Sequence, residues 1–397
     1  MLRLEGAPRR YDWGSVTAIP ELLGWEVDGS PLAELWYGAH VSGPSIATGD
    51  GVNGDLAALI SADAAGMLGD DVVARFGVTL PYLLKIIAAD RPLSLQVHPH
   101  LARASSGYAA EDAAGIPLDS PRRNYRDRNH KPELVFALTT FEAVSGFRAP
   151  RRAAEILSNL DSALARSLVE LLRADPTSAG VRAVFRSLLD PATRPCEQDV
   201  QDLVASCGLR LATGLTSTRA DRNVLLLAQH FPGDPGVVAS LLLNPVTLRP
   251  GEAMFIPAGG VHAYLSGMAI EVMANSDNVL RAGLTAKHVD VSEVLEAVDY
   301  VAAPPVRIAP EVANGATEIF YVPVDDFELS VSRVAGSQEH TVPGRGPRIV
   351  VCLDGQVILG AKADTLVLHR GEAAFVPAAD GPLTVRGRGR LVQADVP

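Results

Sequence analysis

Histidine, carboxylate and amide side chains occur in this sequence at spacings that suit a metal site. Gln96 and His98 are two residues apart, so both side chains point to the same side of a β-strand. Glu133 begins an apolar run, and His262 ends a Gly-x5-Pro-x-Gly-x2-His pattern over residues 251–262. Two imidazoles, a carboxylate and an amide oxygen form a mixed ligand set typical of zinc or another divalent first-row ion. We therefore predict a metal held by these four residues.

Two other histidines keep the ligand assignment open. His100 and His130 neighbour the predicted ligands and could replace one of them. A single strand histidine is more often a core or rim residue, so only the combination supports a metal site. The pattern at 251–262 is similar to the second motif of the cupin barrel, whose histidine usually binds a metal on the inner face. The alternative for this pattern is a hairpin corner with a surface histidine.

A dense run of polar side chains follows His262 within an apolar-rich stretch, where unpaired charge is costly. It contains Tyr264, Glu271, Asn275, Ser276, Asp277, Asn278, Arg281, Lys287 and His288. One interpretation is a network around a substrate, and the alternative is a structural salt-bridge network. Arg281 and Lys287 can hold an anion, and Ser94 can add a hydroxyl group.

The elements that must position these residues change character along the chain. Residues 1–148 alternate short apolar runs with Gly, Pro, Asn and Asp, which is typical of the many short strands of a sandwich or barrel. From Pro150 to about residue 228 the apolar period is helical. Strand character returns after FPGDPG at 231–236, and it is interrupted by a helix at about 290–298 that Asp290 can cap.

Three local predictions are specific enough to check. One helix should bury a single face formed by Leu164, Leu168, Leu171 and Leu172. A second should bury Val200, Leu203, Val204 and Cys207 and end at Gly208 as its C-terminal cap, which makes Cys207 a core residue and not a nucleophile. The segment RIVVCLDGQVILG at 348–360 should form a hairpin that turns at Asp354-Gly355.

Two segments of the chain resemble each other. LRPGEAMFIPA at 248–258 is echoed by LHRGEAAFVPA at 368–378, which suggests two related β-barrels. In the second copy Pro382 stands where the histidine would be, so that barrel should carry no metal. The predicted fold is mainly β with a helical insertion. It comprises a catalytic barrel from residues 1–149 and 232–318, a helical domain at 150–231, and a degenerate barrel at 319–397.

Composition narrows the class of protein. The 397 residues carry a net charge of −11, which disfavours nucleic acid as a partner. No apolar run approaches the ~20 residues of a membrane span, and the N-terminus lacks the apolar segment of a signal peptide. Three cysteines without a CxxC spacing favour a reducing compartment. We expect a cytoplasmic enzyme without a membrane or nucleic-acid partner. The acidic surface permits a monomer and no heptad repeat argues for assembly, so we expect a monomer, with an oligomer as the alternative.

The chain closely resembles the type I mannose-6-phosphate isomerases, also called phosphomannose isomerases. The motifs that carry this resemblance are YDWGS at 11–15, AELWYGAH at 33–40, LSLQVHP at 93–99, NHKPE at 129–133 and GVHAY at 260–264 with its continuation SDNVLRAG at 276–283. The helical insert and the last 80 or so residues fit the family's order but carry little motif. NHKPE and the stretch from the barrel histidine through SDNVLRAG are highly specific in combination.

The resemblance implies a function and a set of site residues. It implies one zinc ion per chain, and reversible isomerisation of mannose 6-phosphate and fructose 6-phosphate through a cis-enediol, within mannose metabolism and GDP-mannose supply. The implied zinc ligands are Gln96, His98, Glu133 and His262, and the implied pocket contains Trp13, Ser94, Lys131, Tyr264, Glu271, Asp277, Arg281 and Lys287. Lys131 or Glu271 is the candidate for proton transfer. Arg281 is the candidate for stabilising the enediolate, and Ser94 and Lys287 are candidates for the phosphate.

Two rival functions remain at this point. An Fe(II) cupin oxygenase would share the barrel and the histidine–carboxylate set, but it would not explain Lys131, Arg281 and Lys287. A protein that binds sugar phosphates without turnover would share the whole pocket. Glycine-rich nucleotide loops are absent from the sequence, which disfavours a nucleotide-binding enzyme.

Overall fold

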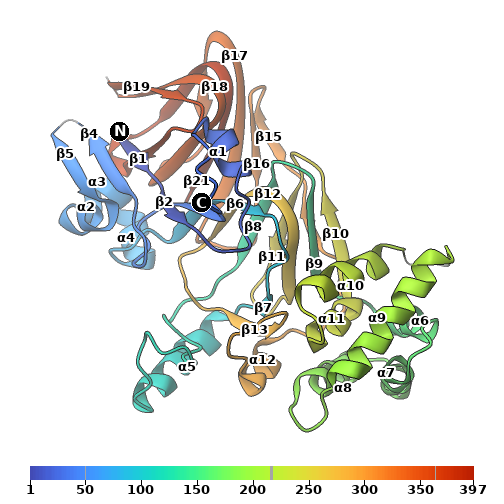
Figure 1. Ribbon diagram of the computed structural model, residues 1–397. Coiled ribbons are helices and arrows are strands. Elements are labelled where there is room, and N and C mark those ends of the chain that lie inside the picture. The colour runs from blue at the N-terminus through green and yellow to red at the C-terminus, as the bar shows by residue number, and fades with distance from the viewer. Residues whose placement is uncertain (50, 215–217, 363) are drawn as a thin grey trace.

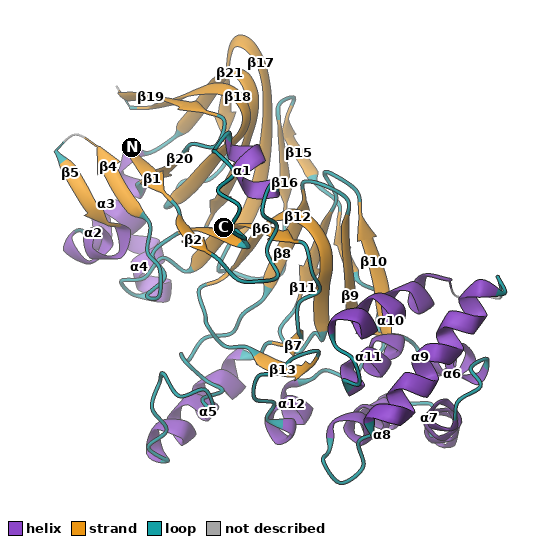
Figure 2. Ribbon diagram, viewed as in Figure 1, coloured by secondary structure: helices purple, strands orange, loops and turns teal. Residues whose placement is uncertain are grey.

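Two β-sheets and a block of helices make up the molecule, as the change from strand to helical periodicity predicted (Figure 2). The computed structural model describes residues 1–49, 51–214, 218–362 and 364–397. The fold is mainly β with a central helical region. Among the described residues, no helix combines the length and the apolar character needed to cross a membrane.

The first sheet has eleven strands within the described residues and carries all four predicted metal ligands on or beside its strands. Its strands are β2 (Ala7–Arg9), β3 (Glu34–Tyr37), β6 (Tyr82–Ala89), β7 (Leu95–Val97), β8 (Glu133–Ala137), β9 (Phe141–Phe147), β10 (Leu243–Leu248), β11 (Ala253–Ile256), β12 (His262–Ala274), β13 (Leu280–Gly283) and β14 (Val306–Ile308).

Strand β12 joins the two halves of this sheet. Its second half pairs with β6 and β8, and its first half pairs with β7 and β9. The strand bends at a bulge between Tyr264 and Ser266. Gly267, directly after it, has a φ of 111°, and a Cβ atom there would collide with the Thr140 carbonyl oxygen. The bend folds the two halves toward each other over a shared apolar cluster that includes Phe141 and Tyr264.

The second sheet has ten strands within the described residues, mostly from the C-terminal part of the chain. They are β1 (Leu2–Glu5), β4 (Ile46–Gly49), β5 (Val52–Asp55), β15 (Glu311–Asn314), β16 (Thr317–Phe320), β17 (Glu328–Val342), β18 (Arg348–Ala361), β19 (Asp364–His369), β20 (Ala373–Val376) and β21 (Leu383–Asp395). In Figure 1 the blue strands β1 and β4 lie beside the red C-terminal strands, because β1 pairs with both β20 and β4. The sequence predicts residues 1–149 as part of the catalytic unit, whereas the N-terminal strands β1, β4 and β5 extend the other sheet.

Helices cover the edges of both sheets. Three short helices lie near β5, at α2 (Leu56–Ala62), α3 (Ala64–Leu68) and α4 (Asp70–Phe76), and the remaining single helices are α1 (Ala18–Leu23), α5 (Leu101–Ala113) and α12 (Val291–Ala297). The central block comprises α6 (Pro150–Ser158), α7 (Ala163–Ala174), α8 (Ser178–Leu189), α9 (Glu197–Ala212), α10 (Thr218–His230) and α11 (Pro235–Ala239), followed by a 3-10 turn at Ser240–Leu242; a second 3-10 turn is at Ala378–Asp380. The block shares one apolar core with β7, β9 and β13.

Helix boundaries agree with the sequence in two places and differ in one. Pro150 opens α6, and the Asp290 side chain caps α12 by accepting from the Glu293 amide. Gly208 does not end α9, which continues to Ala212 because the next turn carries Arg210, whose guanidinium pairs with buried Asp221 of α10. That packing offsets the roughly 1 kcal/mol that a glycine costs inside a helix.

The apolar face of α7 is narrower than predicted. Leu168 and Leu172 are buried, but Leu171 is exposed, because it lies about 100° around the helix from Leu172. Cys207 is buried in the helical core, as predicted.

The repeated segments form the same turn. In each copy the glutamate side chain accepts a hydrogen bond from the amide three residues before it, Glu252 from Arg249 and Glu372 from His369, both at 2.8 Å. The glycine before each glutamate has a φ near 90°. The similarity seen in the sequence is therefore a similarity of backbone structure.

The predicted hairpin at 348–360 is wrong. Residues 348–361 form the single strand β18, which pairs with β21 along its whole length. A bulge against β21 lies between Cys352 and Asp354, and Gly355, directly after it, has a φ of 71°. The Asp-Gly pair, which is typical of a hairpin turn, accompanies a bulge here because the partner strands continue on both sides of it.

Candidate active site

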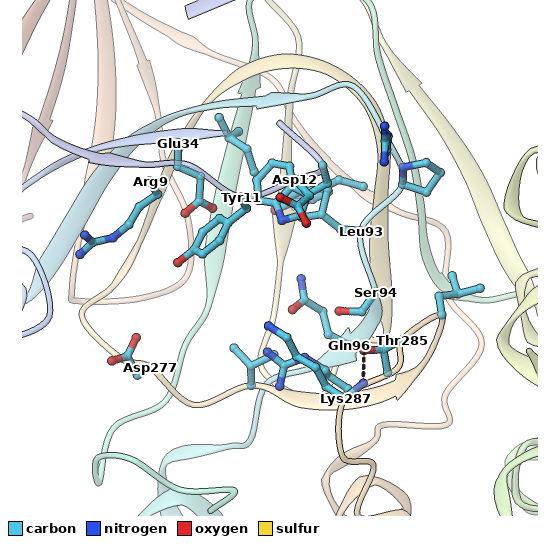
Figure 3. Close-up of a pocket in the computed structure, with 18 of the residues that line it drawn as sticks. Arg9, Tyr11, Asp12, Glu34, Leu93, Ser94, Gln96, Asp277, Thr285 and Lys287 are labelled. Carbon is cyan, nitrogen blue, oxygen red and sulfur yellow. Dashed lines mark hydrogen bonds between the residues drawn. The ribbon is translucent and has the colours of Figure 1, made fainter. Parts of the chain in front are cut away.

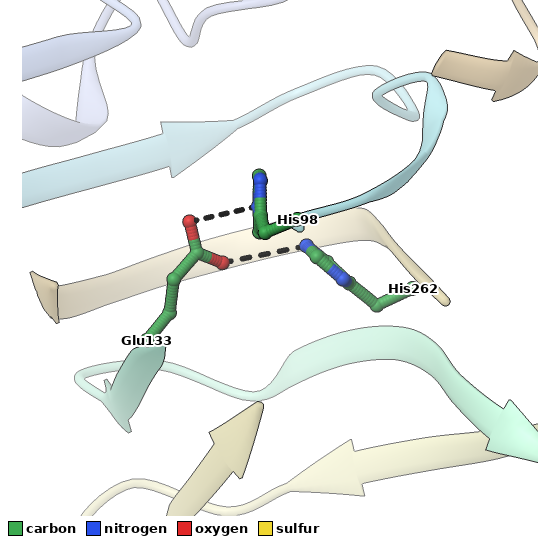
Figure 4. Close-up of side chains that lie close together, drawn as sticks. All are labelled: His98, Glu133 and His262. Atoms are coloured by element: carbon green, nitrogen blue, oxygen red, sulfur yellow. Dashed lines mark ion pairs between the residues drawn. The ribbon is translucent and has the colours of Figure 1, made fainter. Parts of the chain in front are cut away.

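Three predicted metal ligands come together at one end of the first sheet (Figure 4). Glu133 lies between the two imidazoles: its Oε1 is 3.2 Å from His98 Nε2, and its Oε2 is 3.3 Å from His262 Nε2. All three side chains are buried. They come from three segments, since Glu133 opens β8, His98 follows β7 and His262 opens β12.

The other ring nitrogen of each histidine fixes its tautomer. His98 Nδ1 is 2.8 Å from the Asn278 carbonyl oxygen, and His262 Nδ1 is 3.0 Å from that of Gly260. A carbonyl oxygen only accepts, so each Nδ1 carries the proton and donates. Each Nε2 is left with a lone pair, and within the described part of the chain neither has a hydrogen-bond partner. Two buried lone pairs beside a carboxylate fit a divalent metal ion.

Electrostatics favour the ligating protonation states. Burial lowers the pKa of His98 to about 4, which keeps the imidazole neutral near pH 7. Burial raises the pKa of Glu133, but attraction from His98, once that imidazole is protonated at low pH, and from Lys131 outweighs the effect of burial. The pKa of Glu133 therefore lies well below its usual range. The Lys131 ammonium lies 3.5 Å from Glu133 Oε1.

Gln96 lies next to this cluster by strand register. It is the cross-strand partner of His262 on β12 and of Arg281 on β13. Directly opposed residues of antiparallel strands point to the same face of the sheet. The pairing therefore brings the Gln96 amide and the Arg281 guanidinium to the face that carries His262.

A cavity of about 830 Å³ opens in front of the cluster. Ten of the twelve predicted site residues line it, and the two fully buried histidines lie behind Glu133. The ten are Trp13, Ser94, Gln96, Lys131, Glu133, Tyr264, Glu271, Asp277, Arg281 and Lys287. Figure 3 shows Ser94, Gln96, Thr285 and Lys287 grouped together, with Asp277 on a separate part of the wall. This volume is typical of a small-molecule site.

A buried hydrogen-bond network also contacts the Glu133 carboxylate. The Tyr264 hydroxyl lies 2.7 Å from Glu271 Oε1 and 3.2 Å from Glu133 Oε2. Lys85 Nζ donates to Glu271 Oε2 at 2.9 Å, so both carboxylate oxygens of Glu271 are engaged. Burial lowers the pKa of Lys85, but Glu271 and Glu34 outweigh it, and the pKa lies above its ordinary value.

Positive charge gathers on another part of the wall. Burial lowers the pKa of Arg281, and repulsion from Arg126 lowers it further. Burial also lowers the pKa of Lys287, with added repulsion from Arg281 and Arg126. Three like charges that repel one another in a cavity form a site that an anion would stabilise.

The two alternative histidine ligands lie outside the cluster. His100 is exposed and precedes α5. His130 Nε2 lies 3.0 Å from Asp326 Oδ2, away from the residues that line the cavity. Sequence spacing could not separate these histidines from His98, because the separation depends on which way each loop turns.

Known proteins match this chain along its whole length. Residues 1–150 match the family described as phosphomannose isomerase type I, catalytic domain, and residues 317–396 match the mannose-6-phosphate isomerase cupin domain. The mannose-6-phosphate isomerase of Escherichia coli K12 is 41% identical over 99% of both chains. The chain belongs to the type I phosphomannose isomerases. The mannose-6-phosphate isomerase 2 of Arabidopsis thaliana is 31% identical, over 95% of this chain and 88% of its own.

Solved structures of the family agree in fold. A phosphomannose isomerase variant from Salmonella typhimurium superposes with a TM-score of 0.91 at 38% identity, covering 100% of this chain and 99% of its own. A crystal structure of mannose 6-phosphate isomerase bound with zinc and yttrium superposes with a TM-score of 0.89, at the same identity and coverage. The predicted family and its cupin-type fold are thereby confirmed.

Two residues of this phosphomannose isomerase site were missed by sequence reasoning. Lys85 is the one charge in the run PYLLKIIAA, and a buried lysine needs a partner, so the signal was present. Arg126 lies in the basic segment RRNYRDR at 122–128, where nothing in the sequence distinguishes it from its neighbours. Only the loop path after α5 brings Arg126 to the cavity wall.

Proposed function

We propose that this protein interconverts mannose 6-phosphate and fructose 6-phosphate with zinc as its cofactor. The observation that carries the proposal is the meeting, in one cavity, of a buried histidine–carboxylate cluster and a group of cations that repel one another. A sugar phosphate presents hydroxyl and carbonyl oxygens at one end and a dianion at the other. The cavity offers a complementary surface to each end.

The metal ligands in this proposal are His98, Glu133, His262 and Gln96. The two free Nε2 atoms and the Glu133 carboxylate support the first three, and the register of β7 against β12 supports Gln96. When bound, a divalent ion supplies a Lewis acid that polarises an oxygen of the substrate. Asn278 and Gly260 hold the two imidazoles in the ligating tautomer through their carbonyl oxygens.

Lys131 is our candidate for moving the proton between C1 and C2. Aldose and ketose interconvert when a base removes the proton from one carbon and returns it to the other through a cis-enediol. Lys131 lies at the cavity wall beside Glu133. The other candidate, Glu271, is less suited because Tyr264 and Lys85 already engage both of its oxygens. We assign Glu271 to holding Tyr264 in place.

In this proposal Arg281 and Lys287 contact different negatively charged parts of the substrate. Arg281 shares a sheet face with Gln96 and His262, which supports a role at the developing enediolate oxygen. Lys287 and Ser94 lie close together in Figure 3, which supports binding of the phosphate, and Arg126 adds a third charge. Trp13 and Asp277 line the remaining wall, where sugar hydroxyls would lie.

The test is turnover of mannose 6-phosphate by the purified protein before chelation, after chelation and after zinc is added back. We expect activity to be lost on chelation and restored by zinc. Mannose without its phosphate is the matched control substrate, and it should turn over far more slowly. No turnover by zinc-replete, folded protein would reject the proposal.

The rival functions give different outcomes in the same experiment. Tight binding of mannose 6-phosphate without conversion would identify a binding protein. Bound iron together with oxygen uptake would identify a cupin oxygenase.

We also propose that the protein acts as a monomer in the cytoplasm. Three cysteines without a disulfide between them, two of which are buried, suit a reducing compartment. The three-part organisation also remains our proposal, with the N-terminal strands β1, β4 and β5 assigned to the C-terminal unit. Light scattering of the purified protein tests the oligomeric state, and a dimer mass would reject the monomer.

A further inference from the structure

One contact connects the C-terminal sheet directly to the loop that carries the proposed proton-transfer residue. The loop is NHKPE at 129–133, which runs into β8. Asp326, in the connection between β16 and β17, accepts from His130 Nε2 at 3.0 Å. His130 immediately precedes Lys131, and Asp326 is 5% exposed. A buried carboxylate beside an imidazole makes a charge-assisted hydrogen bond whose geometry is held by its surroundings.

The same loop is anchored on its other side by the first sheet. The Asn278 side chain donates to the Asn129 carbonyl oxygen at 2.8 Å, and the Ala274 amide donates to that of Pro132 at 3.1 Å. These anchors hold the backbone on either side of His130 and Lys131. Of the loop's side chains, the His130 imidazole reaches the C-terminal sheet and the Lys131 ammonium reaches Glu133.

We propose that Asp326 is a positioning residue for the isomerisation: it holds His130 and thereby sets the Lys131 ammonium against Glu133 and the cavity. This inference rests on the proposed function, because it assigns a task to the residue that moves the proton. It gives the C-terminal sheet, which lacks the histidine of the metal motif, an indirect part in the reaction. Asp326 itself does not line the cavity, so its effect passes through His130.

The test compares Asp326→Ala with Asp325→Ala in steady-state kinetics. Asp325 is the exposed neighbour. Its backbone carbonyl oxygen accepts from Arg75, and its side chain makes no hydrogen bond with the residues that the structure describes. We expect Asp326→Ala to lower kcat by about 10-fold to 100-fold, since small displacements of a catalytic group cost that much. KM for mannose 6-phosphate and the zinc content should stay within about 2-fold of the parent. Asp325→Ala should leave kcat unchanged.

A double-mutant cycle shows whether Asp326 acts through His130. His130→Ala should lower kcat about as much as Asp326→Ala, and the double variant should be no slower than either single variant. Asp326→Asn keeps an acceptor oxygen, so its kcat should lie between those of the parent and Asp326→Ala. This variant replaces Asp326→Ala in the test if the alanine variant does not fold. Asp326→Glu should recover part of the loss.

Two outcomes would overturn the inference. One is a kcat for folded Asp326→Ala, or for Asp326→Asn if the alanine variant does not fold, equal to that of Asp325→Ala. The other is additive losses in the double variant. Neither outcome affects the proposed function, which fails only if the parent protein shows no turnover.

Discussion

At the scale of single residues, the free Nε2 atoms of His98 and His262 determine what the site can bind. We expect His262→Ala to weaken zinc affinity by at least about 100-fold, and so to lower zinc content and abolish turnover, because one of the two imidazole ligands is lost. Metal analysis by mass spectrometry after dialysis measures this. His100→Ala is the control, since that exposed histidine lies outside the cluster and should leave both quantities unchanged. Full zinc retention by His262→Ala would remove it from the ligand set.

Arg281 offers a second test at this scale. Replacing its planar guanidinium by the Lys ammonium keeps the charge but loses the two-pronged geometry that can span two oxygens. We expect Arg281→Lys to lower kcat by about 10-fold to 100-fold with a smaller change in KM. Steady-state kinetics with mannose 6-phosphate measure both constants. A raised KM with unchanged kcat would move Arg281 to phosphate binding.

At the scale of elements, the β17–β21 ladder places two carboxyl groups opposite each other. Glu328 and Asp395 are cross-strand partners, and both are buried. Burial raises the pKa of both carboxyl groups. The Asp395 pKa lies well above its usual range, with repulsion from Glu328 adding to the effect and Arg348 opposing it. A raised carboxyl pKa means that the folded state holds a proton which the unfolded state releases. The contribution of this pair to the free energy of unfolding is therefore greatest below about pH 4, and it falls as the pH rises through the raised pKa values.

Glu328→Gln tests that pH dependence. The substitution keeps the shape and a donor for Asp395 but removes one charge, so we expect the free energy of unfolding at pH 7 to rise by about 1–3 kcal/mol. The gain should vanish below about pH 4, where both proteins carry neutral side chains. Urea unfolding across this pH range measures it. Glu311→Gln, at an exposed position of β15, is the control, and a gain of the same size there would contradict the explanation.

At the scale of the whole molecule, the two sheets share one apolar core and a hydroxyl that bridges them. Tyr82 begins β6 of the first sheet, and its buried hydroxyl lies 3.0 Å from the Pro347 carbonyl oxygen and 2.9 Å from that of Ala394, both in the C-terminal sheet region. Leu84 and Ile270 of the first sheet pack in the same cluster as residues of the second. The two sheets should therefore unfold together.

Tyr82→Phe tests how strongly the sheets are coupled. It leaves two buried carbonyl oxygens without this donor, so we expect a loss of about 1–2 kcal/mol in the free energy of unfolding. Tyr37→Phe is the matched control, because the Tyr37 hydroxyl forms no side-chain hydrogen bond within the described residues. Urea unfolding followed by fluorescence measures both variants. An equal loss in the two would show that the bridge contributes nothing.

Much of the site was predictable from local spacing. The two-residue separation of Gln96 and His98, the Gly–Pro–Gly–His pattern and the NHKPE segment each encode a local backbone geometry, and ten of the twelve predicted residues line one cavity. The helical block and the turn shared by the two repeats were predictable for the same reason. Where a local signal serves two structures, as Asp354-Gly355 does for a hairpin or a bulge, the prediction failed because the partner strands decide between them.

By itself, the sequence determined the family, the residue types of the metal cluster and the alternation of strands and helices, because these depend on short-range spacing and on side-chain chemistry. Only the tertiary structure decided which histidine lies beside Glu133, because His130 and His98 differ in the direction of their loops and not in their spacing. It also decided the partner of Lys85, which is 186 residues away along the chain, and the contact of Asp326 with the loop at 129–133. Such contacts depend on how distant segments pack, and no local pattern encodes them.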